Sequence, residues 1–104
     1  MKIINVTEDN FEKEVINSKV PVLIDFNADW CGPCRMLKPV LDEIASESDE
    51  YKIVSINVDD EEELAEKYGV SSIPCLVLIK DGKEEKRSIG VKPKSEIKSL
   101  LGDK

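Results

Sequence analysis

Two stretches of the chain are almost continuously apolar, at residues 20–26 and 75–80. A short run with so few polar positions is typical of a strand that is covered on both faces of a sheet. Residues 51–58 form a third apolar run, residues 2–6 a short β-prone run and residues 83–89 a more polar one, and the last two are expected at the sheet edges. The pattern therefore predicts a sheet of about five strands.

Helical spacing of apolar residues appears between these strands. After Cys34 the apolar positions are 37, 40, 41, 44 and 45, which form one face of an amphipathic helix. We expect Thr7 to cap a short first helix and Pro93 to start a last one. The acidic run at 59–63 resembles a binding patch, but we interpret it as the N-cap and first turn of a helix that Gly69 ends.

The order of these elements is strand, helix, strand, helix, strand, helix, strand, strand, helix. Crossover connections in the first units predict parallel strand pairs, and Asp81-Gly82 predicts a two-residue hairpin with an antiparallel pair. We therefore expect one α/β domain over residues 1–104, with a central mixed sheet flanked by about four helices on its two faces.

Composition narrows the class of function. The chain has 15 basic and 22 acidic residues, a formal net charge of −7, which argues against binding to nucleic acid. No run approaches the roughly 20 apolar residues of a membrane span, and the first residues lack a signal-peptide pattern. We expect a cytoplasmic protein that contacts neither membrane nor nucleic acid. Three cysteines are too few for a disulfide-stapled scaffold.

The candidate chemistry lies in Trp30-Cys31-Gly32-Pro33-Cys34, between the strand at 20–26 and the following helix. Two thiols three residues apart on a first helical turn are close enough to form a small disulfide ring. The first thiol also lies where unpaired backbone N–H groups and the helix dipole favour the thiolate, which is the reactive form of cysteine. A Cys-x-x-Cys motif placed between a strand and a helix therefore predicts redox chemistry.

Other interpretations of this motif stay open. Cys-x-x-Cys can be half of a zinc site, but the chain has no histidine and only one further cysteine, Cys75. A purely structural disulfide would stabilise little, because so small a ring hardly constrains the unfolded chain. A metal site built from Cys31, Cys34 and Cys75, and a non-catalytic role as a binding subunit, are the remaining alternatives. We expect no metal and no cofactor besides a redox-active Cys31–Cys34 disulfide.

Asp25 is an acidic residue in the middle of the apolar strand, six residues before Cys31. A carboxylate at such a position loses its hydration, so its pKa should rise. It could simply bond a backbone group at the end of the sheet. Because perturbed acids gather at reactive sites, we interpret Asp25 as functional.

Several stretches of the sequence resemble the thioredoxin family over essentially the whole chain. They are Val22-Leu23-Ile24-Asp25-Phe26, Ala28-Asp29-Trp30-Cys31-Gly32-Pro33-Cys34, Pro39, Asn57-Val58-Asp59, Tyr68-Gly69-Val70 and Ile73-Pro74, together with Asp81-Gly82 and Gly90. The resemblance implies the thioredoxin fold and the activity of a protein-disulfide reductase. It also implies two kinds of partner, a thioredoxin reductase and disulfide-containing client proteins. We expect a monomer.

The resemblance also implies a role for each site residue. Cys31 is the attacking thiolate, Cys34 resolves the mixed disulfide, and Asp25 takes the proton of Cys34. Gly32 and Pro33 set a reducing potential. The substrate-facing surface comprises Trp30, Ile73, Pro74, Gly90 and Val91, with a cis peptide bond expected before Pro74.

Three positions depart from the family pattern. Asn27 stands where an aromatic residue is usual, and Ser55 stands where a lysine is common, which leaves the coupling of Asp25 to a cation open. Cys75 follows the proline where threonine is usual. Cys75 is either a small packing residue or an auxiliary thiol that can capture Cys31 or a substrate sulfur.

Overall fold

The computed structural model describes residues 2–102 and contains one five-stranded mixed sheet. The strands are β1 (Ile4–Asn5), β2 (Val22–Asn27), β3 (Lys52–Asn57), β4 (Cys75–Lys80) and β5 (Lys83–Ile89). They lie in the order β1-β3-β2-β4-β5, so the two predicted edge strands are at the edges. β3 pairs in parallel with β1 and β2, whereas β4 pairs antiparallel with β2 and β5.

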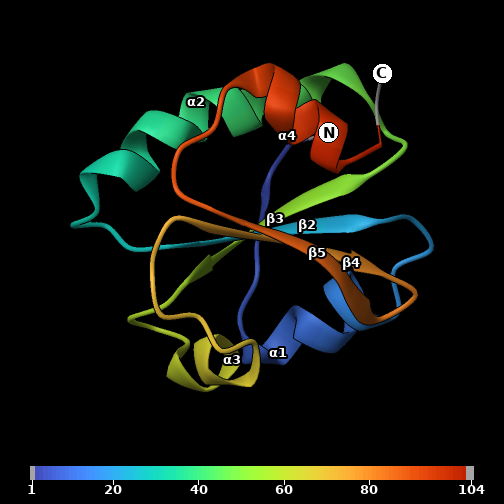
Figure 1. The fold of residues 1–104 in the computed structure, drawn as a ribbon. Coiled ribbons are helices and arrows are strands. Elements are labelled where there is room, and N and C mark those ends of the chain that lie inside the picture. Colours follow the sequence, from blue (N-terminus) through green and yellow to red (C-terminus); the bar gives the residue numbers. More distant parts are fainter. Residues whose placement is uncertain (1, 103–104) are drawn as a thin grey trace.

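Helices cover both faces of the sheet, as predicted (Figure 1). The α-helices are α1 (Glu8–Phe11), α2 (Gly32–Glu47), α3 (Glu62–Lys67) and α4 (Lys94–Leu100), and α1 continues as a π-helical segment, η1 (Glu12–Ile16). Figure 1 shows α2 and α4 on one face and α1 and α3 on the other. The apolar spacing predicted the first helix but not its widening into a π-helical segment.

Alternation along the strands divides the core into two layers. In β2, Leu23 packs with the buried residues of α2 and α4, while Val22, Ile24 and Phe26 pack in the layer that contains Phe11 of α1 and Leu64 of α3. Because successive strand residues point to opposite faces, Asp25 lies on the same face as Leu23, toward α2. Cys75 belongs to the layer of Phe26, on the other face.

The turns follow the predicted chemistry. Asp81 and Gly82 have φ angles of 51° and 78°, which is the positive pair that a two-residue type I′ hairpin requires. Gly69 has a φ of 61° just beyond α3, as expected for a glycine that ends a helix. Thr7 caps α1, and its hydroxyl accepts a hydrogen bond from the backbone N–H of Asp9.

The acidic run supplies the N-cap and the first turn of α3, as predicted, since Glu61 is the N-cap and Glu62 and Glu63 follow it. The Glu61 side chain makes no cap bond and instead accepts a hydrogen bond from the N–H of Glu8. Pro93 is the N-cap of α4 with extended backbone, rather than its first helical residue. No helix within residues 2–102 has the length and apolar character needed to cross a membrane.

Candidate active site

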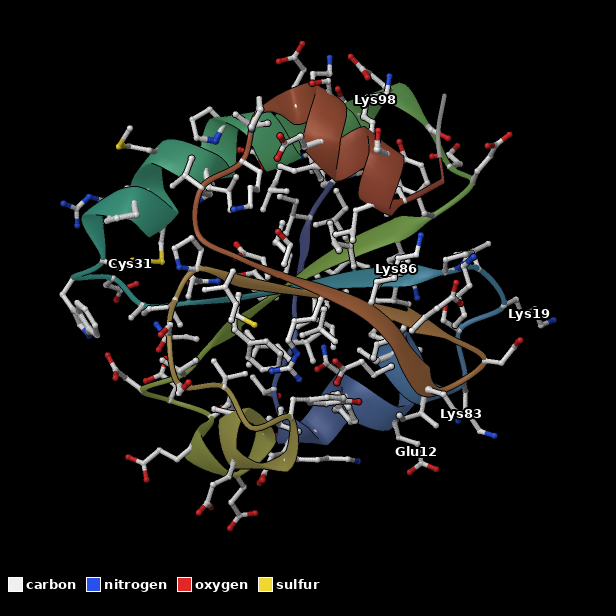
Figure 2. The ribbon with its side chains drawn as sticks, viewed as in Figure 1. Glu12, Lys19, Cys31, Lys83, Lys86 and Lys98 are labelled. Carbon is white, nitrogen blue, oxygen red and sulfur yellow. A yellow bond between two sulfur atoms is a disulfide. The ribbon has the colours of Figure 1, made fainter. Side chains whose placement is uncertain are left out.

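The Cys31–Cys34 pair lies at the start of α2, shortly after the carboxyl end of β2. Figure 2 shows Cys31 at the start of α2, at one end of the molecule, with Lys83 of the β4–β5 hairpin at the opposite end. The two cysteines form a disulfide, with their Cα atoms 5.2 Å apart. The disulfide therefore closes the first turn of α2.

Cys31 is the N-cap residue of α2. Its backbone is extended, and its Sγ accepts a hydrogen bond from the backbone N–H of Cys34 at 3.2 Å. This N–H is one of the first donors of the helix, which have no carbonyl partner within the helix. When the disulfide is reduced, the same donor and the helix dipole favour negative charge on the Cys31 sulfur.

The two sulfurs are largely covered by apolar neighbours. Cys31 and Cys34 are 4% and 5% exposed, and they pack with Ala28, Val58 and Ile73. The Cys31 Sγ lies 4.0 Å from the carbonyl oxygen of Ile73. Exposure therefore does not distinguish the two thiols, whereas their positions on α2 do.

Trp30 is 68% exposed beside this pair. Its Nε1 donates a hydrogen bond to Asp59 Oδ2 at 2.8 Å, and Asn57 Oδ1 accepts from the backbone N–H groups of Asp59 and Asp60. The turn after β3 therefore holds the tryptophan in place. The sequence pattern does not predict this role of Asn57 and Asp59, because the contact joins segments that are about 30 residues apart.

Asp25 is 6% exposed, as its position in an apolar strand predicted. Burial raises the pKa of its carboxyl to about 7, while a hydrogen bond from Asn27 acts to lower that pKa. Within residues 2–102, Asp25 Oδ1 has no hydrogen-bond partner, and Oδ2 accepts only from Asn27 Nδ2, at 3.4 Å. The carboxyl is therefore not held by a backbone donor there, which argues against the purely structural interpretation.

Asp25 and Cys34 line the same groove, between α2 and the edge of the sheet. Other residues along this groove include Asn27, Ser55, Lys38 and Pro39. Asp25 and Cys34 therefore border one space that is open to solvent. A proton can therefore be exchanged between this region and water.

Three residues of the predicted substrate surface, Ile73, Pro74 and Gly90, lie near the disulfide because β4 pairs antiparallel with β2 and β5. The Ile73–Pro74 peptide bond is cis, and the carbonyl of Pro74 accepts a hydrogen bond from the N–H of Gly90 at 2.8 Å. Ile73 packs against the two cysteines. Val91 follows Gly90 and is 42% exposed.

The two residues between the cysteines form the start of α2. Gly32 is half-buried, and Pro33 is exposed in the first turn, where a proline is tolerated. A Cβ built on Gly32 would meet only Arg35 Nη2, at 4.0 Å. Steric crowding therefore does not explain the glycine.

Cys75 is free, is 1% exposed and faces the side of the sheet opposite Asp25. Burial raises the pKa of its thiol. The three thiols therefore do not converge on one point, and residues 2–102 contain no group of three or more side chains arranged to hold a metal ion. The packing interpretation of Cys75 is the one that this placement favours.

Comparison with known proteins gives consistent matches over nearly the whole chain. The family model described as Thioredoxin matches residues 2–103. The protein called Thioredoxin from Pyropia yezoensis is 49% identical over 102 residues, which are 97% of this chain and 95% of that protein. Thioredoxin 1 from Synechococcus elongatus is 46% identical, covering 92% and 91% of the two chains. Thioredoxin from Pseudomonas aeruginosa is 43% identical, covering 95% and 93%.

Proposed function

The chain belongs to the thioredoxin family and catalyses dithiol–disulfide exchange through its Cys31–Cys34 pair, and we propose how its own residues divide that reaction. Cys31 is the nucleophile, Cys34 is the resolving thiol and Asp25 is the proton acceptor. The observation that carries this assignment is the hydrogen bond from the N–H of Cys34 to the Sγ of Cys31. It gives a backbone donor to one sulfur of the pair, which stabilises a thiolate at that sulfur.

The reaction begins when the Cys31 thiolate attacks one sulfur of a client disulfide. The client S–S bond breaks, its second sulfur leaves as a thiolate, and a mixed disulfide joins Cys31 to the client. Cys34 then gives its proton to the Asp25 carboxylate and attacks the Cys31 sulfur. The remaining client sulfur leaves as a thiolate, so the client is reduced by two electrons and the Cys31–Cys34 disulfide is restored.

Asp25 suits the resolving step because of where it lies and how it titrates. It lines the groove that Cys34 also lines, and its pKa of about 7 allows it both to take up and to release a proton near neutral pH. Deprotonation of Cys34 inside a covered site needs such a nearby acceptor, because the thiol itself is a poor nucleophile.

The client is proposed to bind over Trp30, Ile73, Pro74, Gly90 and Val91. Trp30 and Val91 are exposed apolar side chains, and Ile73, Pro74 and Gly90 are joined to each other and to the disulfide by the contacts described above. Gly32 and Pro33 are proposed to set a reducing potential. Electrons return from a thioredoxin reductase, as the family implies, and the protein works as a cytoplasmic, single-domain monomer with no bound cofactor.

Reduction of insulin tests this function. With dithiothreitol as the electron source, the protein should accelerate insulin reduction, and both Cys31→Ser and Cys34→Ser should lose catalytic turnover. A redox titration against glutathione should find a potential more reducing than the glutathione pool. Absence of turnover would instead favour a non-catalytic binding subunit, and a potential far more oxidising than glutathione would contradict the reductase assignment.

A further inference from the structure

We propose that Asn27, held in place by Ser55, positions the carboxyl group of Asp25 and sets the pH range in which it accepts a proton. Asn27 and Ser55 are thus positioning residues, since neither touches the sulfur atoms in the contacts described. Their importance for catalysis rests on the proposed function, because it requires that Asp25 receive the proton of Cys34.

The Asn27 side-chain amide is fixed by three contacts. Its Nδ2 donates to Ser55 Oγ at 2.7 Å and to the backbone carbonyl of Asp25 at 2.9 Å, and it lies 3.4 Å from Asp25 Oδ2. The two shorter bonds hold the amide, and because Nδ2 carries only two hydrogens, the longer contact with the carboxyl group shares one of them. The carboxyl therefore faces a donor whose position does not depend on the carboxyl itself.

Strand register brings these three residues together. Asp25 on β2 is the direct partner of Ser55 on the parallel strand β3. Asn27 is two residues beyond Asp25 and shares its face of β2. Leu23 of β2 and Ile53 of β3 pack on this same face, beneath α2. The amide is thus built into the sheet by its backbone, not by a mobile surface contact.

The surroundings of Asp25 contain charged groups, but none of them pairs with it among the residues described. The groove carries Lys2, Asp29, Arg35, Lys38, Asp42, Asp60 and Glu61, contributed by the N-terminus, by α2 and by the turns after β2 and β3. The thiols nearby are Cys34, on α2, and Cys75, which lies on β4 and faces the opposite side of the sheet. Within residues 2–102, Asn27 is the one hydrogen-bond donor to the Asp25 carboxylate.

A neutral donor in this place has a defined electrostatic effect. Burial raises the pKa of Asp25 and the Asn27 hydrogen bond lowers it, since the N–H group stabilises the ionised carboxylate. Without the amide, the pKa of Asp25 should rise above its value of about 7. More of the protein would then carry a protonated Asp25 at pH 7, and a protonated carboxyl cannot accept the proton of Cys34.

Direct titration of Asp25 tests the proposal. The oxidised protein is labelled with ¹³C at its aspartate carboxyl carbons, and the Asp25 signal is assigned by its loss in Asp25→Asn. In Asn27→Ala the pKa of Asp25 should rise by about 0.5–1 unit, less than the loss of a short hydrogen bond to a charged group would give, because the Nδ2–Oδ2 contact is 3.4 Å long. Ser55→Ala should give a smaller rise by releasing the amide, and Ser55→Thr, which keeps the hydroxyl, should restore the wild-type value.

Asn5→Ala is the matched control. Asn5 is exposed, lines the same groove and pairs with Ser55 from β1, but makes no hydrogen bond to Asp25. Its loss should leave the titration of Asp25 unchanged. An unchanged or lower pKa in Asn27→Ala would overturn the proposal, and so would an equal rise in Asn5→Ala, which would assign the effect to the groove in general.

A second measurement separates this proposal from the proposed function. The pH dependence of mixed-disulfide resolution should move to higher pH in Asn27→Ala, by the same amount as the Asp25 titration. If the titration moves and the kinetic profile does not, the positioning role stands and the assignment of Asp25 as proton acceptor fails. If Asn27→Ala does not fold, Ser55→Ala carries the same test, and an unchanged titration there overturns the proposal.

Discussion

The site places two ionisable groups in opposite environments. The Cys31 sulfur receives a backbone N–H at the start of α2, which favours its charged form. The Asp25 carboxyl is buried on β2, the strand that precedes α2. Its Oδ1 has no hydrogen-bond partner among the described residues, and both features disfavour the charged form of the carboxyl. When the disulfide is reduced, negative charge is therefore favoured on the Cys31 sulfur, whereas the Asp25 carboxyl exchanges its proton near neutral pH.

Burial of Asp25 predicts a pH-dependent stability. Its pKa in the folded protein is about 7, against an ordinary value of 3.8, so the folded state binds more protons than the unfolded state between these values. Stability from this group is therefore fully present below pH 3.8 and is lost as the pH rises toward 7. This pKa shift corresponds to about 4 kcal/mol at pH 8, and Asp25→Asn should recover about 1–3 kcal/mol of it in urea unfolding, because the buried amide also loses hydration.

The gain in Asp25→Asn should fade as the pH is lowered to about 4, because the wild-type carboxyl is then neutral as well. Asp42→Asn is the matched control, since Asp42 is an exposed acid on α2 that lines the same groove. It should not change the slope of stability against pH. A gain in Asp25→Asn that is equal at pH 4 and pH 8 would show that the charge of Asp25 is not its cause.

Cys75 should behave as a packing residue. It is 1% exposed and lies beside its strand partner Phe26, on the face of the sheet away from α2. Alkylation of the oxidised protein, in which Cys31 and Cys34 are protected, should therefore label Cys75 only after unfolding. Cys75→Thr should keep full insulin-reducing activity. Rapid labelling without denaturant, or loss of activity in Cys75→Thr, would support an auxiliary thiol instead.

Some residue contacts could be predicted from the sequence and others could not. Burial of Asp25 followed from the apolar residues around it, and the position of Cys31 followed from the strand–helix boundary. The contact between Asn27 and Ser55 joins residues 28 positions apart, and it depends on the register between β2 and β3. Apolar spacing predicts strands but does not determine that register, so the polar cluster at Asp25 appeared only in the structure.

At the scale of elements, three separate connections meet at the disulfide. β4 runs antiparallel to β2, so Cys75 at its start pairs with Phe26 near the end of β2. The last residue of β5, Ile89, pairs with the same Cys75. The turn before β4 and the loop after β5 therefore both lie near the end of β2, where α2 starts. This explains why Pro74 and Gly90, which are 16 positions apart, are joined by a hydrogen bond.

Gly90 should matter for client binding as well as for folding. Its φ of 93° is unfavourable for any residue with a Cβ. Gly90→Ala should lower the free energy of unfolding by about 1 kcal/mol or more and should also raise the KM for insulin several-fold, because the loop beside Pro74 shifts. Denaturant unfolding and steady-state kinetics measure the two effects.

Gly102→Ala is the control that separates the effect of backbone strain from the effect of lying beside Pro74. Gly102 has a φ of 80° just beyond α4, and an added Cβ meets no atom within 4 Å, as is also true of Gly90. It should lose similar stability and keep the wild-type KM. Equal KM values in the two variants would remove the loop after β5 from the proposed client surface.

Element prediction succeeded where one periodicity dominated. The helix after Cys34 and the apolar strands were clear because long segments followed one spacing throughout. The start of α3 was less clear, because five successive acids carry no information about which of them begins the helix. The structure shows that Glu61 is the N-cap and makes no side-chain cap bond. The acidic residues of the first turn are Glu62 and Glu63.

At the scale of the whole molecule, the fold places the disulfide at one end of the sheet. Helices cover both faces (Figure 1), so the carboxyl ends of the parallel strands β2 and β3 are where a site can open. The disulfide follows β2, and the turn that holds Trp30 follows β3. The order of elements and the mixed sheet could be predicted from the sequence, whereas the meeting of these turns required the strand order.

The central claim is that Cys31 attacks and Cys34 resolves, and trapping of mixed disulfides tests it most directly. Each single variant, Cys34→Ser and Cys31→Ser, is reduced, mixed with a disulfide-containing client such as insulin, and separated by non-reducing electrophoresis. Cys34→Ser should accumulate a covalent complex that dithiothreitol releases, because the nucleophile remains and the resolving thiol is gone, while Cys31→Ser should form little or none. Equal or greater trapping by Cys31→Ser would show that Cys34 is the nucleophile and would contradict the account.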